Sequence, residues 1–476
     1  MANPTVDEET PLLFESSGRV KRTPLPTWQL AIVLLILLCE PFTGNSIFPY
    51  INQAKLGITG GDDRKVGYYA GLIESLFYVT EAMTTLQWGR ISDRIGRKPI
   101  LLIGLVGNAL SMVCFGLSRT FWMLVISRCL CGFLNGNIGV LKSVIGELTD
   151  STNRADGFAY ISVVWSVGAT IAPVIGGSLS HPHERFPIVF TSNFWREFPY
   201  FLPSFAIATF SFVCLLITLL LFNEASNSLC LIQTPPYQNM HTLPRHHKQH
   251  VSAPFSGDDK PLPIHKLFTY PVVLSVCNYF CISLMDIAFF SLLPLFMSTP
   301  VELGGLGCSP ATIGYVLGAL GAYIGIVQIA LFPKLVRRFG ERRIFIMSVL
   351  TITINSLLLP VISGNIRKNG VTWMICCLFA FALSLRAVTI MSYGCIFVYV
   401  NTSSPNKSSL GATNGIAQTV VSVARAIGPG LATSLFALSL QKNLLGGYAV
   451  YTFLFLFSCI SLLFAVRLPH QVWDKS

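Results

Sequence analysis

Blocks of about 20 apolar residues, separated by short polar stretches that carry Gly and Pro, recur along the chain. A helix of that length crosses the hydrocarbon core of a bilayer, where the backbone must satisfy its own hydrogen bonds. Charged residues make up only 12% of the 476 residues, and the mean hydropathy is +0.60. A soluble chain would need more charge to cover its surface. The sequence therefore predicts a polytopic all-α membrane protein.

The apolar blocks divide into two sets of six, separated by a polar, Pro-rich and His-bearing segment that is typical of a flexible linker. The twelve predicted spans are residues 28–50, 67–88, 99–117, 121–141, 157–179, 200–222, 271–296, 311–332, 344–362, 371–397, 411–440 and 447–466. The implied organisation is an N-terminal tail (1–24), a six-helix bundle (25–222), the linker (223–266), a second six-helix bundle (267–468) and a C-terminal tail (469–476).

The distribution of basic residues predicts the orientation in the membrane. With the N-terminus in the cytosol, the cytosolic segments carry 20 Lys and Arg and the opposite loops carry 9. Residues 1–22 contain no apolar stretch that could act as a cleavable signal. The excess of positive charge therefore places both termini in the cytosol. Two glycosylation acceptor patterns, at Asn401 and Asn406, then fall in a cytosolic loop and should carry no glycan.

The segment that joins the second and third spans combines glycines, one acid and several basic residues. Its defining residues are Gly89, Asp93, Arg94, Gly96, Arg97 and Lys98. The glycines allow helices to approach and the chain to turn, an acid near the start of a helix is stabilised by the helix dipole, and the basic residues anchor at the inner surface. An ordinary positively charged loop would not need the glycines and the acid at these spacings. A degenerate copy follows the eighth span, at residues 332–348.

This run resembles the signature G-x-x-x-D-R-x-G-R-K of the major facilitator superfamily, and it matches at every position. In the fourth span, Arg128, Gly132 and Gly136 match the R-x-x-x-G-x-x-x-G pattern of proton-coupled members. The fifth span resembles the pattern of the antiporter branch, with Gly168, Ala172, Pro173, Gly176 and Gly177 at its defining positions. The surrounding sequence is similar to fungal drug:proton antiporters and to plant zinc-induced facilitators.

The resemblance implies two six-helix bundles related by pseudo-twofold symmetry, and proton-coupled efflux or sequestration of small organic solutes. No phosphate-binding loop for ATP is present, so an ion gradient should supply the energy. Proton coupling needs an ionisable group inside the membrane. The candidate acids are Glu40, Glu74, Glu81 and Asp286. Four basic residues, Arg128, Lys142, Arg386 and Arg425, lie within spans or at their edges. Each acid either takes part in transport or forms a structural ion pair with one of the three arginines.

Two further features of the first six spans allow more than one interpretation. Arg128 could modulate the proton affinity of a nearby carboxylate, or it could clamp its helix to the first span. The small residues and Pro173 of the fifth span predict a stiff or kinked hinge at the interface of the two halves. Gly428, Pro429 and Gly430 look like its counterpart in the second half.

The favoured function is a proton-coupled antiporter of drug-like, cationic or amphiphilic solutes. A facilitative or symport carrier is the alternative, and a non-transporting nutrient sensor or an enzyme is disfavoured because the chain has no large extra domain, nucleophile motif or nucleotide loop. We expect no cofactor, metal or nucleic acid, and a monomer in the lipid bilayer. Four histidines at 241–250 fit a solvated linker better than a metal site. Glu8, Leu12 and Leu13 resemble an acidic dileucine sorting signal, which favours a vacuolar or endosomal membrane over the plasma membrane.

Overall fold

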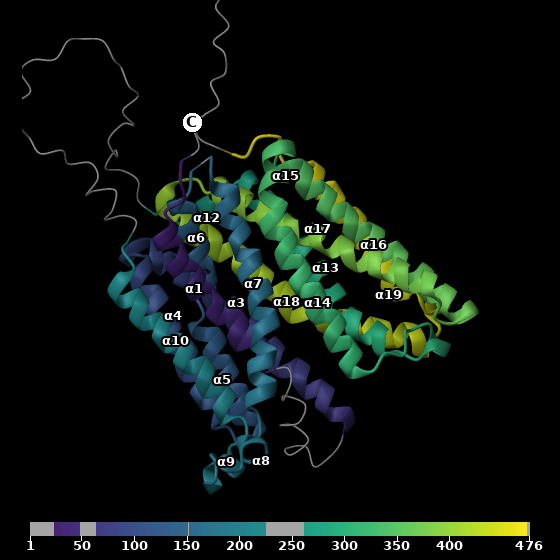
Figure 1. Cartoon of the computed structure of the whole chain (residues 1–476). Coiled ribbons are helices and arrows are strands. Elements are labelled where there is room, and N and C mark those ends of the chain that lie inside the picture. Colours follow the sequence, from purple (N-terminus) through teal and green to yellow (C-terminus); the bar gives the residue numbers. More distant parts are fainter. Residues whose placement is uncertain (1–22, 48–62, 151, 225–260, 474–476) are drawn as a thin grey trace, which may run out of the picture.

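The computed structural model describes residues 23–47, 63–150, 152–224 and 261–473, with only the backbone described for 63–74, 310 and 311. The described residues form helices and connecting loops, without any strand. Figure 1 shows the helices as two groups, one from the first half of the chain and one from the second. The expected all-α fold of two six-helix bundles is therefore confirmed, and the groups are called the N-half and the C-half below.

The N-half begins near the described start of the chain and ends before the segment at 225–260. Its helices are α1 (Thr27–Asn45), α3 (Asp63–Ile95), α4 (Arg97–Gly116), α5 (Phe121–Leu134), α6 (Asn137–Leu148), α7 (Arg154–Leu179), the short α8 (Pro182–Arg185) and α9 (Asn193–Glu197), and α10 (Phe201–Leu221). The short α8 and α9 lie at one end of the bundle (Figure 1). The start of α1 lies at the opposite end, where Thr23 hydrogen-bonds to Thr152.

Among the described residues, the C-half repeats this order of six long helices. Its elements are α12 (Ile264–Leu267), α13 (Tyr270–Ser298), η1 (Val301–Leu303), α14 (Pro310–Ala330), α15 (Phe332–Phe339), α16 (Glu341–Asn369), α17 (Trp373–Ser403), η2 (Lys407–Ser409), α18 (Leu410–Gln441), η3 (Leu444–Gly447) and α19 (Ala449–Val466). The short α15 and the described end of the chain lie at the end of the molecule opposite α8 and α9 (Figure 1). We call this end, which also carries residues 89–98, the signature end.

Eleven of the described helical segments are long and apolar enough to cross a membrane, with α5 and α6 together forming one of them. The remaining predicted span, residues 67–88, corresponds to α3. This helix is long enough to cross a membrane but is more polar, because it carries Glu74, Glu81 and several threonines. Its polar face is not exposed to lipid, because Glu81 and Thr85 are buried. The low hydropathy of α3 thus reflects its position between the two halves.

The fourth predicted span, 121–141, is broken in the structure. Helix α5 ends at Leu134, Asn135 leaves the helical conformation, and α6 continues to Leu148, seven residues beyond the predicted end. A Cβ atom on Gly136 would meet the indole of Trp88 at 2.5 Å, so only glycine allows the break to pack against α3. The break places α6 against both α4 and α18, which brings Lys142 to the interface of the halves.

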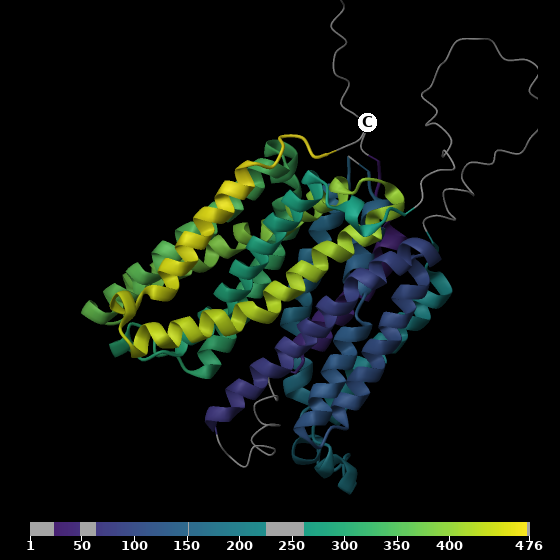
Figure 2. The ribbon, with the colours of Figure 1, turned by 180° about the vertical axis from the view of Figure 1, so that it is seen from behind.

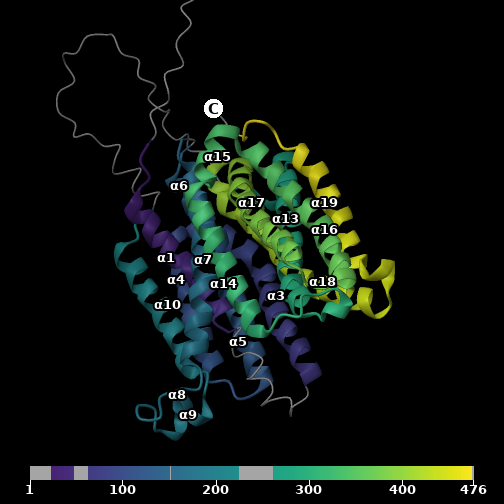
Figure 3. The same cartoon turned by 45° about the vertical axis from the view of Figure 1, so that its right-hand side comes forward.

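Two pairs of helices make the main contacts between the halves. Helix α3 packs along α18, and α7 packs along α14 (Figures 2 and 3). Gly89 and Gly411 allow the first contact, because a Cβ atom on Gly89 would overlap the carbonyl oxygen of Gly411. Ser166 and Thr170 of α7 face Gly325 and Gly321 of α14 in the second. Helices α3 and α14 are the second spans of their halves, and α7 and α18 are the fifth. The pseudo-twofold relation therefore exchanges the α3–α18 contact with the α14–α7 contact.

Candidate functional site: buried charges between the halves

Glu81 of α3 is completely buried where α3 meets α18. The hydroxyl of Ser422 donates a hydrogen bond of 3.0 Å to its Oε2, and the Nε2 of Gln418 donates one of 3.3 Å to its Oε1. Gln418 and Ser422 are four residues apart, so they lie on one face of α18. A carboxylate that belongs to the N-half is therefore held by donors from the C-half.

Lys142 of α6 is 5% exposed and also reaches across the interface. Its Nζ donates hydrogen bonds of 2.8 Å to the hydroxyl of Tyr279 and to the Oε1 of Gln418. The rings of Tyr279 and Phe397 flank the ammonium group, with their centroids 4.8 and 4.4 Å from Nζ. Gln418 thus connects Lys142 to Glu81, and all three polar groups bridge the two halves.

Glu40 of α1 and Arg425 of α18 complete the group. Both carboxylate oxygens of Glu40 are buried. Asn135 is a polar neighbour, but neither oxygen accepts a hydrogen bond of favourable geometry from the described residues. The guanidinium carbon of Arg425 lies 5.9 Å from the ring centroid of Tyr78 and 5.4 Å from that of Trp165. Cation–π attraction to two N-half rings therefore holds this C-half side chain.

These four charged groups interact with one another electrostatically, and we call Glu40, Glu81, Lys142 and Arg425 the central charge cluster. They come from α1, α3, α6 and α18, so the cluster includes both halves. Two acids and two bases make it neutral when every group is ionised. Sequence reasoning named Glu40, Glu81 and Arg425 as candidates but did not include Lys142, which lay at the edge of the predicted span.

Asp286 and Arg386 form a separate ion pair inside the C-half. The Nη1 of Arg386, on α17, lies 2.5 Å from the Oδ1 of Asp286, on α13. The hydroxyl of Tyr393 donates a hydrogen bond of 3.0 Å to the Oδ2 of Asp286, and the ring of Phe289 lies 5.0 Å from the guanidinium carbon of Arg386. Asp286 thus forms the ion pair with an arginine that was one of the two roles expected for each acid.

Arg128 of α5 lies within the N-half and is 8% exposed. Its Nη2 donates a hydrogen bond of 3.2 Å to the carbonyl oxygen of Thr43 on α1, and its guanidinium carbon lies 5.2 Å from the ring centroid of Phe115. Among the residues that the structure describes, no carboxylate forms an ion pair with Arg128. The geometry thus corresponds to a clamp between α5 and α1, while Gly132 and Gly136 pack against α3.

The signature segment contacts the opposite half through Asp93. The amide of Gly411 donates a hydrogen bond of 2.8 Å to its Oδ1, and the amide of Ala412 donates one of 2.7 Å to its Oδ2. These amides belong to the first turn of α18. We expected Asp93 to act at the start of the next helix in its own half. It instead caps a helix of the C-half, where its charge meets the positive end of the helix dipole.

Arg97 holds Asp93 in this position. Its Nη1 lies 2.6 Å from the Oδ1 of Asp93, and its Nη2 lies 2.8 Å from the Oε1 of Glu147. Lys98 donates a hydrogen bond of 2.8 Å to the carbonyl oxygen of Phe222, so it is a structural anchor within the N-half. The remaining two signature residues are Gly96, which turns the chain with a φ of 99°, and Arg94, which is exposed.

The degenerate copy of the signature makes an equivalent contact in the opposite direction. Arg337 of α15 donates from its Nη1 to the Oδ1 of Asp156 at 2.9 Å. Asp156 lies in the first turn of α7, in the N-half. Two polar contacts, one from each half, therefore close the signature end.

The small-residue pattern of α7 does not face the other half, contrary to our expectation. Gly168 packs against the ring of Pro41, and Gly176 packs against the backbone of Ser46, both from the α1 region of the N-half. Helix α7 also continues through Pro173 to Leu179, and Gly177 lies in its last turn. The pattern thus brings α7 close to α1, and the opposite face of α7 contacts α14.

Several predicted features lie outside the described residues and stay predictions. These are the side chain of Glu74, the sorting signal at Glu8, Leu12 and Leu13, and the histidines of the linker. Both glycosylation acceptor positions are described. The side chain of Asn401 is buried and donates a hydrogen bond of 3.0 Å to the carbonyl oxygen of Phe397, whereas Asn406 precedes η2.

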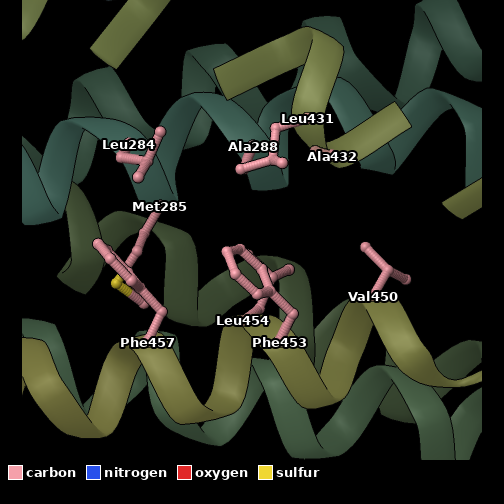
Figure 4. Close-up of a pocket in the computed structure, with 9 residues that line it drawn as sticks. All are labelled: Leu284, Met285, Ala288, Leu431, Ala432, Val450, Phe453, Leu454 and Phe457. Atoms are coloured by element: carbon pink, nitrogen blue, oxygen red, sulfur yellow. The ribbon is translucent and has the colours of Figure 1, made fainter. Parts of the chain in front are cut away.

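A small pocket in the C-half is entirely apolar, as Figure 4 shows. It lies among α13, α18 and α19, and its lining residues are Leu284, Met285, Ala288, Leu431, Ala432, Val450, Phe453, Leu454 and Phe457. No polar group in this lining could orient a solute. The central charge cluster is therefore the stronger candidate for the functional site.

Two groups of membrane-length helices, with buried charges between them and polar contacts at one end, define an integral membrane protein built from two halves. The sequence model of the Major Facilitator Superfamily matches residues 30–429, and the chain belongs to this family. Like its relatives, it is a transporter, and it is not an enzyme. The human organic anion transporter MFSD10 (TETRAN) has the same fold, with a TM-score of 0.67 and 18% identity over 93% of this chain and 100% of that one.

The curated relatives include transporters of fungi and plants. The chain is 30% identical to the major facilitator-type transporter psiT2 of Psilocybe cyanescens, over 93% of this chain and 92% of that protein. It is 28% identical to the multidrug transporter mfsB of Aspergillus fumigatus, over 91% and 81% of the two chains. It is also 28% identical to ZINC INDUCED FACILITATOR-LIKE 1 of Arabidopsis thaliana, over 89% and 86%. The expected resemblance to fungal drug transporters and plant zinc-induced facilitators is thus confirmed.

Proposed function

We propose that the protein is a proton-coupled antiporter that moves small, drug-like organic solutes by alternating access. The observation that carries the proposal is the position of Glu81, a buried carboxylate of the N-half whose hydrogen-bond donors, Ser422 and Gln418, belong to the C-half. Hydrogen bonds to an ionised acceptor are stronger than those to a neutral one. Protonation of Glu81 would weaken the contact between the halves, so proton binding and opening of the signature end are linked.

The test measures solute flux into proteoliposomes for a panel of cationic and amphiphilic compounds, with and without an imposed pH gradient. We expect the unmodified protein to accumulate at least one compound when the gradient is present. Glu81→Gln should abolish this accumulation, because the side chain can no longer release a proton, but it should keep exchange that needs no gradient. Glu197→Gln is the matched control, since Glu197 is about half exposed and pairs with Arg119 far from the cluster.

The other candidate acids follow from the same reasoning. Glu40→Gln should also uncouple accumulation, since Glu40 lies in the central charge cluster. Asp286→Asn was expected to behave alike, but it would leave Arg386 without its ion-pair partner, so a loss of thermal stability should accompany its loss of flux. Full pH-driven accumulation by all three variants would show that none of these acids couples transport to the proton. An unmodified protein that equilibrates its solute but accumulates none under the gradient would indicate a facilitative carrier.

We further propose that the signature end faces the cytosol and that the protein works in a vacuolar or endosomal membrane. The excess of basic residues on the segments at that end supports the orientation. The sequence around Leu12 and Leu13 supports the address. Replacing both leucines with alanine should move a fluorescently tagged protein to the cell surface. An unchanged distribution would exclude this signal, and a glycan on Asn401 or Asn406 would contradict the orientation.

A further inference from the structure

Arg425 has fewer hydrogen-bond and ion-pair partners than the buried cations Lys142 and Arg386. Lys142 donates two hydrogen bonds, and Arg386 pairs with Asp286. The Nη1 of Arg425 is buried without a hydrogen-bond partner, and no carboxylate among the described residues lies within ion-pair distance of its guanidinium group. Buried donors are normally satisfied, because leaving one unpaired is costly. An acceptor from outside the protein would satisfy this one.

The aromatic neighbours of Arg425 hold the side chain without using its hydrogen-bonding capacity. Tyr78 of α3 and Trp165 of α7 attract the guanidinium group through their ring faces, whereas the N–H groups of a guanidinium point outward in its own plane. Such a planar fork binds a carboxylate or a phosphate group through two parallel hydrogen bonds. Arg425 is therefore positioned but chemically unsatisfied, at a place where both halves contribute.

Glu40 shows the same property with the opposite charge. Its two carboxylate oxygens are buried and lack hydrogen bonds of favourable geometry, and it interacts with Arg425 electrostatically without forming an ion pair. The other members of the cluster are already engaged, because Glu81 and Lys142 share Gln418 and have further partners. One acid and one base in the same cluster therefore have unused capacity.

We propose that Glu40 and Arg425 bind the two charged groups of a zwitterionic aromatic substrate. Glu40 takes the cationic group, Arg425 takes the carboxylate or phosphate group, and Tyr78 and Trp165 contact the aromatic ring. The inference rests on the proposed transport function and adds its substrate class. A zwitterion would satisfy both groups and leave the net charge of the cluster unchanged, whereas a simple cation would leave Arg425 unsatisfied.

The test measures equilibrium binding to the full-length protein in lipid nanodiscs, without any gradient. The probes share a naphthalene ring: 3-(2-naphthyl)alanine and its homologues with more widely spaced charges, 2-(2-naphthyl)ethylamine, and 3-(2-naphthyl)propionate. At least one zwitterion should bind about tenfold more tightly than the amine or the acid, because each of these lacks one charge-assisted hydrogen bond. Equal affinity of the zwitterions and the amine, or no binding of any zwitterion, would overturn the proposal.

Variants separate recognition from a merely structural role. Arg425→Gln should reduce the affinity for the zwitterion to that for the amine and leave amine binding unchanged. Glu40→Gln should reduce it to that for the acid. Arg425→Lys, which keeps the charge but loses the planar fork, should give an intermediate affinity for the zwitterion. Arg119→Gln, which removes a half-exposed arginine far from the cluster, is the control.

The outcomes distinguish this inference from the proposed function. A structural role for Arg425 would weaken the binding of all three probe types together, which would contradict the proposal. Since binding needs no gradient, a failure of proton coupling would leave the order of affinities intact. Proton-driven transport of compounds that carry a positive charge alone, combined with the absence of zwitterion preference, would keep the antiporter and exclude the substrate class.

Discussion

The carboxylate of Asp93 stabilises the start of a helix that lies far away in the chain. The two residues whose amides it binds follow it by 318 and 319 residues. A carboxylate at a helix N-terminus contributes about 0.3–1 kcal/mol when exposed and up to about 2 kcal/mol when partly buried. The side chain of Asp93 is 1% exposed, and the cost of burying its charge offsets part of this stabilisation. In the proposed cycle this contact breaks when the signature end opens, so its free energy favours the closed state.

Asp93→Asn should therefore shift the balance between closed and open states and reduce the rate of transport several-fold, while expression stays largely intact. Asparagine keeps one acceptor oxygen but loses the charge that the helix dipole and Arg97 stabilise. The measurement is flux per molecule of reconstituted protein. Arg90→Gln serves as the control, because Arg90 is a neighbour on the same helix that is not one of the signature residues. Undiminished flux in Asp93→Asn would mean that the segment only anchors the loop.

The residues of the central charge cluster were predictable from the sequence to different degrees. Glu40 and Glu81 were recognised because an acid in the middle of an apolar block has few structural explanations. Lys142 was not, since it follows the predicted end of a span, where a lysine normally reaches the membrane surface. Only the break at Asn135 and Gly136 shows that its helix turns inward. The aromatic partners of Arg425 come from two distant helices, and a single sequence carries no signal for such pairing.

At the scale of helices, the contact between α3 and α18 depends on the absence of side chains. A Cβ atom on Gly89 would overlap the backbone carbonyl of Gly411, and one on Gly415 would lie 3.1 Å from the Cα of Leu86. Small residues at such contacts allow membrane helices to pack closely. The sequence predicted that Gly89 would permit a close approach, but not which helix would approach.

Gly89→Val should prevent α3 and α18 from packing at the signature end, because the atoms that it meets belong to the backbone and cannot move aside. Overpacking of this kind costs about 1–3 kcal/mol. We expect a loss of most transport and a lower melting temperature in detergent. Gly318→Val, in α14, is the matched control, because a Cβ atom there meets nothing within 4 Å. An equal effect of the two substitutions would indicate a general intolerance of valine in these helices.

The hinge expected in α7 illustrates what a motif leaves undetermined. Pro173 and the glycines identified a helix with special packing, and the structure shows such packing. The direction of that packing was wrong, since the glycines face α1 while Ser166 and Thr170 face the C-half. A pattern of small residues defines which face of a helix packs closely, but the identity of its neighbour depends on the arrangement of all the helices.

At the scale of the whole molecule, the halves are joined near the signature end and their ribbons diverge toward the end that carries α8 and α9 (Figure 2). The joining contacts include the Asp93 cap on α18, the Arg337–Asp156 ion pair, and the bridge through Gln418. All of them must break for the signature end to open. In the alternating-access cycle that we propose, one half moves as a rigid body against the other, about a site between them.

This motion can be tested by linking the halves covalently at Asp156 and Arg337. Their side chains are 2.9 Å apart, and that of Arg337 is 45% exposed, so a cysteine pair at these positions should react with a short bis-methanethiosulfonate linker. The ion pair itself contributes little, since pairs with an exposed member are typically worth about 0–1 kcal/mol. The unlinked double variant should therefore transport nearly as well as the unmodified protein.

The linked form should lose transport because the signature end cannot open, and a reducing agent should restore it. Each single cysteine variant, treated identically, controls for reaction at the native cysteines. Full transport by quantitatively linked protein would show that the halves do not separate at this end during the cycle.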